Sequence, residues 1–146
     1  MTSLGNGALL QIAAKVLTRP AGTAPGPEAL PAAVRRAYVD LTRVSAPLIG
    51  QVGVDALTGR ALHLAQRQYP WLVYARAPEQ ADARLAQVIL CLERQDSAVA
   101  TEAAAAVFAI LTGLLVTFIG EPLTAHLLRQ AWPDALVDLS TKESHA

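Results

Sequence analysis

The chain has little cysteine, few aromatic residues and no net charge, and each shortage excludes a class of protein. Cys91 is the only cysteine, so an internal disulfide is excluded and a reducing, cytoplasmic location is expected. Twelve basic residues balance twelve acidic ones, so no overall field draws the chain to nucleic acid. The first apolar stretch follows no basic segment, which is unlike a secretory signal. A near-neutral surface favours self-association instead.

The sequence also lacks the motifs of common catalytic, metal and cofactor sites. No glycine-rich phosphate loop follows a strand, and no serine stands in a nucleophile elbow. Cys91 has no adjacent histidine, and His126 has no second histidine or cysteine at a metal-ligand spacing. We therefore expect a non-enzymatic protein that needs no metal and no cofactor.

Strand-like alternation of apolar and polar residues is missing as well, whereas helical spacing recurs along the chain. A length of 146 residues suits one domain with its own core. The sequence therefore predicts an all-α, single-domain bundle of about five to six helices around a central hydrophobic helix at 97–119. Because only 5% of the residues are aromatic and alanine is abundant, the helices should be closely spaced.

The most apolar feature is the uncharged run at 103–120, which is about 18 residues and therefore long enough to be a candidate membrane span. Glu102 and Glu121 flank this run, and no Trp or Tyr stands at either end, so the flanks do not favour insertion. We predict a buried core helix here. A membrane-spanning helix is the alternative.

Two stripes run along this predicted helix. Small residues recur every four positions, at Ala105, Ala109 and Gly113, and they permit a neighbouring helix to approach closely. Bulky residues lie on another face, and we expect them to be among the most buried in the protein: Phe108, Leu111, Leu115 and Phe118.

The N-terminal residues 1–19 are predicted to form an amphipathic helix, tethered by a Pro/Gly linker at 20–30 to a bundle at 31–139, with a polar tail at 140–146. A helix this short is not stable alone. It must dock on its own bundle or exchange with a second copy of the chain. Its apolar side chains are the interaction candidates: Leu9, Leu10, Ile12, Val16 and Leu17.

Capping residues, prolines and glycines predict the helix boundaries within the bundle. Ser45 is expected to cap a new helix that holds Pro47 in its first turn and runs to Gln68, with a break at 50–53 as the alternative. Pro78 is expected to start a helix whose polar face includes Arg84.

Two clusters carry side chains suited to binding. Arg60, His63 and Arg67 share a helical face, which suits a phosphorylatable histidine or an anion-binding patch, although a solvated basic face is the simpler interpretation.

Tyr69, Trp71 and Tyr74 form an aromatic cluster. We expect it to close one end of the bundle, with Trp71 and Leu72 pointing inward, and contact with a ligand or partner is the alternative.

Together these observations favour a protein-interaction module with a regulatory or adaptor role, acting through helix–helix association as a cytoplasmic homodimer. One alternative is a protein associated with the inner membrane through 103–120. Another is a histidine-phosphotransfer or small-ligand-binding bundle that uses His63. The preference for arginine over lysine and the abundance of alanine indicate a bacterial source.

Overall fold

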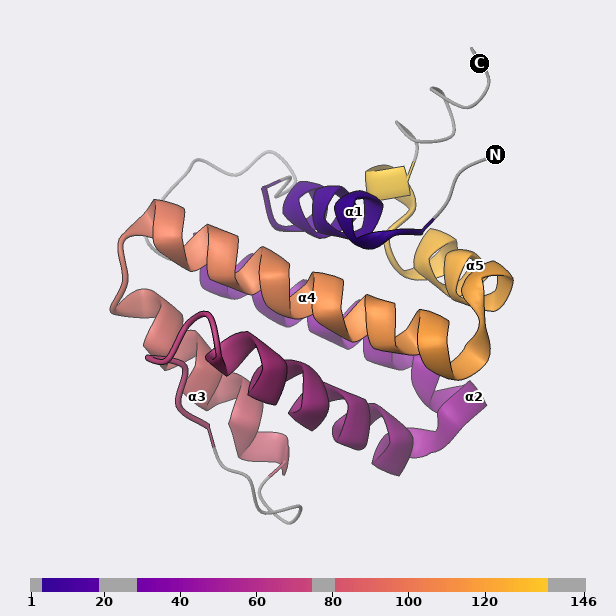
Figure 1. Cartoon of the computed structure of the whole chain (residues 1–146), viewed down its shortest axis with the longest axis horizontal. Helices are drawn as coiled ribbons and strands as arrows, with labels where there is room; N and C mark the ends of the chain where they lie inside the picture. Colours follow the sequence, from indigo (N-terminus) through magenta and orange to yellow (C-terminus); the bar gives the residue numbers. More distant parts are fainter. Residues whose placement is uncertain (1–3, 19–28, 75–80, 137–146) are drawn as a thin grey trace.

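The computed structural model describes residues 4–18, 29–74 and 81–136. In chain order its helices are α1 (Asn6–Thr18), α2 (Ala29–Gln66), α3 (Ala81–Glu93), α4 (Ser97–Ile119) and α5 (Glu121–Ala131), and a helical turn follows at 133–136 (Figure 1). These three ranges contain no strand, so the predicted all-α fold is confirmed. The expected start of a helix at Pro78, the linker residues 20–28 and the polar tail lie outside the described residues.

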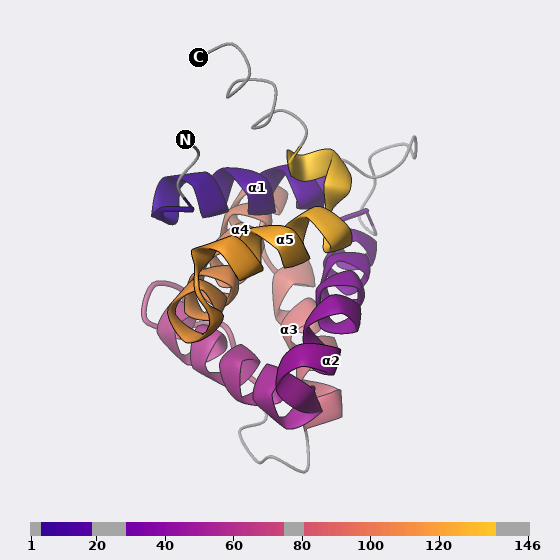
Figure 2. The same ribbon diagram turned by 90° about the vertical axis from the view of Figure 1, so that its right-hand side faces the viewer.

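α4 lies in the middle of the bundle and packs against each of the other four helices (Figures 1 and 2). The helix begins after Asp96, whose carboxylate accepts a hydrogen bond from the Ala98 backbone N–H at 3.2 Å. Among the described helices, α4 is the one long and apolar enough to cross a membrane by length and composition, and 44% of its most apolar 18-residue window is buried in the protein. The predicted central helix is therefore present, and its neighbours cover it in part.

The burial predicted for the bulky residues of α4 is confirmed for three of them and wrong for the fourth. Phe108, Leu111 and Leu115 are at most 4% exposed, whereas Phe118 is 63% exposed. Helical periodicity fixes the face on which a side chain lies, but it does not fix how far along the axis the neighbouring helices extend. Phe118 lies on the last turn of α4, past the cover that those neighbours provide.

α1 packs across α4, where the small residues of α4 allow it to come close (Figure 2). A Cβ atom at Gly113 would lie 3.7 Å from Leu9 Cδ1, which is van der Waals contact, and Ala105 is buried. The side chains of Leu9, Ile12 and Leu17 are at most 4% exposed. Val16 is half-buried and Ala109 packs against the core, whereas Leu10 is exposed. The small-residue stripe thus contacts another helix, and exchange of α1 between copies stays a prediction.

α2 bends sharply at Gly50, where φ is 82° and ψ is 155°. The new helix expected at Ser45 is therefore wrong, and the alternative break at 50–53 is confirmed. The chain stays helical through Pro47, although proline removes one backbone hydrogen bond. It bends at Gly50 instead, because only glycine readily adopts the backbone angles found there. The two halves of α2, 29–49 and 51–66, run in opposite directions across the molecule (Figure 1).

Contacts from the C-terminal helices close the bundle. α5 begins directly after Gly120, with Pro122 in its first turn, where the missing N–H of proline costs no helical hydrogen bond. At its other end the Trp132 indole N–H donates to the Ala37 carbonyl at 3.2 Å, and the Trp132 ring packs edge-on against Phe108 with centroids 5.8 Å apart. These contacts attach α5 to both the first half of α2 and the central helix.

Candidate functional site

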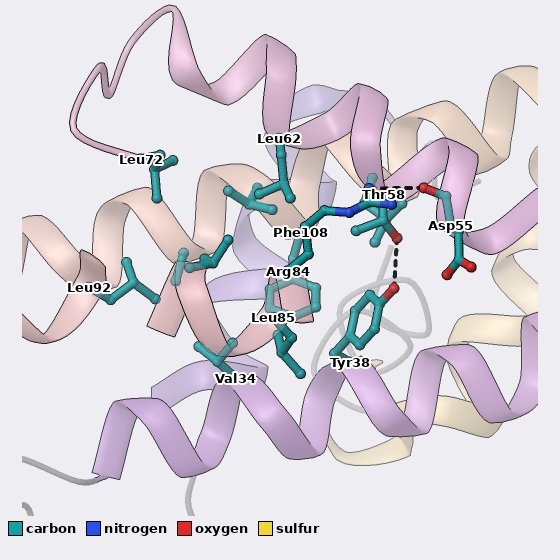
Figure 3. A pocket seen from close by; sticks show the side chains of 14 residues that line it. Val34, Tyr38, Asp55, Thr58, Leu62, Leu72, Arg84, Leu85, Leu92 and Phe108 are labelled. Atoms are coloured by element: carbon teal, nitrogen blue, oxygen red, sulfur yellow. Dashed lines mark hydrogen bonds between the residues drawn. The ribbon is translucent and has the colours of Figure 1, made fainter. Parts of the chain in front are cut away.

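A cavity lies between the two halves of α2, α3 and α4 (Figure 3). The cavity itself is small, about 50 Å³, and it opens to solvent; the empty space is about 610 Å³ only when the open solvent at its mouth is included. The lining residues are Val34, Tyr38, Asp55, Thr58, Leu62, Leu72, Arg84, Leu85, Val88, Leu92, Ala104, Val107, Phe108 and Leu111. Mostly apolar walls with a few polar groups are the composition of small-molecule sites.

The polar groups gather at one end of this cavity and the apolar groups at the other. Figure 3 shows Leu72 and Leu92 at one end, and Tyr38 and Asp55 at the opposite end. The backbone carbonyl of Leu72 accepts a hydrogen bond from the Gln66 side chain at 2.7 Å, and the Leu72 side chain is fully buried. The cavity is therefore amphipathic along its length.

Tyr38 and Thr58 form a fixed pair of hydroxyl groups at the polar end. Thr58 donates its single proton to the Val54 carbonyl at 2.8 Å, so Tyr38 must donate to Thr58 across 2.9 Å. Burial raises the pKa of Tyr38 above its ordinary value, and the negative charge of Asp55 raises it further. The phenol therefore stays neutral at physiological pH and ties the two halves of α2 together.

Arg84 is the charged group of the cavity. Its side chain is only 7% exposed, and Nη1 donates to the backbone carbonyl of Asp55 at 3.2 Å. Its Nε is buried without a hydrogen-bond partner, and no carboxylate within the described ranges forms an ion pair with it. The carboxylate of Asp55 accepts a hydrogen bond from Gln51 at 2.9 Å instead. A buried guanidinium without a counter-ion is energetically costly.

Gly59 makes the position of this guanidinium accessible. A Cβ atom at Gly59 would lie 2.7 Å from Arg84 Nη1, closer than side chains pack. The absence of a side chain on this turn of α2 therefore allows the cation to reach the Asp55 carbonyl.

The expectation that Arg84 belongs to the polar face of its helix is wrong. Arg84 lies four residues before Val88 and eight before Leu92, so helical periodicity places all three on one side of α3. The charge of Arg84 suggests an exposed position, whereas this spacing indicates a buried one. This spacing is the feature of the sequence that identifies Arg84 as a residue on the same side of α3 as Val88 and Leu92.

Arg60 and His63 lie on the second half of α2 and Arg67 lies in the turn that follows it, and none of the three lines the cavity. Arg60 and Arg67 are exposed and His63 is half-buried. Across the described residues, no group of three or more His, Cys, Asp or Glu side chains is placed to hold a metal ion.

The aromatic cluster lies beside the apolar end of the cavity. Tyr69 and Trp71 pack edge-on with centroids 5.8 Å apart, and both are half-buried, as is Tyr74. Of this segment, Leu72 rather than Trp71 enters the cavity wall. Cys91 Sγ lies 3.4 Å from the backbone N of Val73, which fastens the segment to α3.

Comparison of the chain with models of protein families, with curated proteins and with solved structures found no match.

Proposed function

We propose that this protein binds a small amphipathic organic molecule in the cavity between α2, α3 and α4. The observation that carries the proposal is Arg84, a buried cation at one end of an otherwise apolar cavity, whose Nε has no partner. Replacing such a group by an apolar one commonly leaves a protein equally or more stable, so its presence indicates a use other than stability. This proposal keeps the small-ligand alternative but moves it from His63 to Arg84.

A titration with eight-carbon probes tests the proposal. We expect octan-1-ol or octanoate to bind the full chain with a measurable heat and to raise its melting temperature, because a ligand that binds only the folded state stabilises it. Leu85 is half-buried in the cavity wall, so Leu85→Trp should fill the cavity and abolish binding.

The matched control is Leu90→Trp, because Leu90 is on the same helix but 56% exposed and outside the cavity lining. This variant should bind as the wild type does. If neither probe binds the wild type, or if both tryptophan variants bind equally well, the proposed site is wrong.

A second observation supports self-association as a homodimer. Four large apolar side chains are exposed around the two glycine bends, Gly50 and Gly120, and Figure 1 shows both bends at the same end of the molecule. We call them the apolar end: Leu48, Val52, Phe118 and Leu123. A second copy suits this surface because its apolar side chains can pair with those of an identical surface, and a net charge of zero adds no repulsion between copies.

Size-exclusion chromatography of the full chain, followed by light scattering, measures this association. We expect a dimer for the wild type, a monomer for the double variant Val52→Ser/Phe118→Ser, and a dimer for the control Leu90→Ser. A monomeric wild type would contradict the proposal. Recovery of the protein only with detergent-solubilised membranes would favour the spanning role of α4 over a cytoplasmic location.

A further inference from the structure

We infer that the ligand of this cavity is an organic monocarboxylate with an apolar body, and that Arg84 binds its carboxylate. The inference rests on the proposed function, because it presupposes that the cavity is a binding site. It adds the charge of the ligand, the residue that recognises this charge and the direction in which the ligand lies.

The free hydrogen-bonding groups of Arg84 suit a carboxylate. Nη1 is engaged by the Asp55 carbonyl, whereas Nε has no partner and no hydrogen bond involves Nη2 within the described part of the chain. Nε and Nη2 are the two donors of one edge of a guanidinium, and this edge binds a carboxylate through two parallel hydrogen bonds. A bound carboxylate would therefore supply both the missing acceptor and the missing counter-ion.

The number of charges in the cavity favours one negative charge over two. Arg84 is the one cation among the lining residues, and Asp55 is the one anion. A doubly charged phosphate would leave part of its charge without a partner in an apolar surrounding, which is costly. A monocarboxylate matches the single guanidinium.

The remaining walls specify an apolar body. From Arg84 the lining continues along α3 through Val88 to Leu92, and eight residues of helix span about 12 Å. An extended chain of eight carbons is about 9 Å long, because each C–C bond of about 1.5 Å advances the chain by about 1.25 Å, so it is shorter than this span. At the far end Leu72 and Leu92 close the cavity, so a second charged group on the ligand would be buried without a partner (Figure 3).

Isothermal titration calorimetry of the full chain with three probes of equal length tests the inference. We expect octanoate to bind about 10- to 100-fold more tightly than octan-1-ol, because hydrogen bonds to a charged group are stronger than neutral ones. Octylamine, which is a cation at neutral pH, should bind more weakly than the alcohol. Arg84→Met should reduce the affinity for octanoate far more than the affinity for octan-1-ol, so that the two affinities become similar. Arg84→Lys should retain part of the preference, since a lysine keeps the charge but not the paired donors.

Two further variants separate anion recognition from general effects. Arg36 is exposed on the first half of α2, so Arg36→Met should bind octanoate as the wild type does. Asp55→Asn removes the one nearby negative charge and should strengthen octanoate binding. Equal affinities of the wild type for octanoate and octan-1-ol, or octanoate binding that survives Arg84→Met, would overturn the inference and leave the cavity as a neutral binding site. If no probe binds, the proposed function itself fails.

Discussion

Replacing Arg84 by methionine should make the ligand-free protein more stable. In the wild type, burial of Nε without a partner costs about 1–3 kcal/mol. The variant loses one hydrogen bond to a backbone carbonyl, from Nη1 to Asp55 at 3.2 Å, and methionine keeps a side chain of similar length in the gap beside Gly59. Replacing buried charges by apolar residues is often neutral or stabilising by about 1–4 kcal/mol. We expect a net gain of about 1 kcal/mol.

Urea unfolding and differential scanning calorimetry without ligand measure this gain. For a chain of 146 residues, 1 kcal/mol corresponds to a rise of about 3 °C in melting temperature. Arg36→Met is the control for loss of an exposed arginine and should change the free energy of unfolding by less than about 0.5 kcal/mol. A loss of more than about 1 kcal/mol in Arg84→Met, with an unchanged urea slope, would show that Arg84 is a structural donor and refute the reasoning.

Substitutions at three further positions test the backbone, the packing and the pH dependence of stability. Gly50→Ala should lower the free energy of unfolding, measured by urea unfolding, by about 1–3 kcal/mol. The site has open space for a Cβ atom, but φ is 82°, which an alanine rarely adopts. The control Gly7→Ala, in a helix, should raise this free energy by up to about 1 kcal/mol. By the same measurement Gly113→Ala should be neutral or stabilising, because its Cβ would meet Leu9 at 3.7 Å, whereas Gly113→Leu should displace α1 and destabilise the protein. For Tyr38, burial raises the pKa above 10.0, so the unfolded chain loses this proton first and stability falls as the pH rises above about 10. Tyr38→Phe should therefore show a shallower fall in melting temperature between about pH 9 and pH 11, while losing about 1 kcal/mol at neutral pH with the hydrogen bond to Thr58.

Each of these expectations has a contrary result. Equal stability of Gly50→Ala and the wild type would mean that the bend in α2 does not need glycine. A destabilised Gly113→Ala would place α1 closer to α4 than van der Waals contact. A fall with pH that is unchanged in Tyr38→Phe would assign the alkaline transition to other groups, such as Tyr69, where burial followed by the charge of Glu102 also raises the pKa.

Local patterns in the sequence were sufficient to predict the helices and the position of the central one. The apolar run and the cap at Asp96 fix α4, and the glycine–proline pair after it fixes the start of α5. The bend in α2 was harder, because Pro47 and Gly50 both interrupt helices and only tertiary packing decides between them. Ser45 is buried rather than placed as a cap, which no local pattern reveals.

The spacing of Arg84, Val88 and Leu92 indicates the side of α3 on which Arg84 lies, but the cavity itself could not be predicted, because it depends on contacts between distant segments. Arg84 is buried only because Gly59 and the Asp55 carbonyl, on the far half of α2, receive it. Charged residues are mostly exposed, so an arginine is predicted to lie on the surface unless its partners in the fold are known. The imidazole of His63 suggests a phosphotransfer or ligand site, yet His63 does not line the cavity.

The contact between α1 and α4 sets an order of events during synthesis of the chain. The Leu4 backbone N–H donates to the Glu121 carboxylate across 117 residues of sequence. α1 itself packs against α4, which is synthesised much later than α1. A ribosome adds about 5–20 residues per second, so α1 waits roughly ten seconds for its partner. During this interval Leu9, Ile12 and Leu17 lack the cover that α4 provides, and the nascent chain is then most open to chaperones and to aggregation.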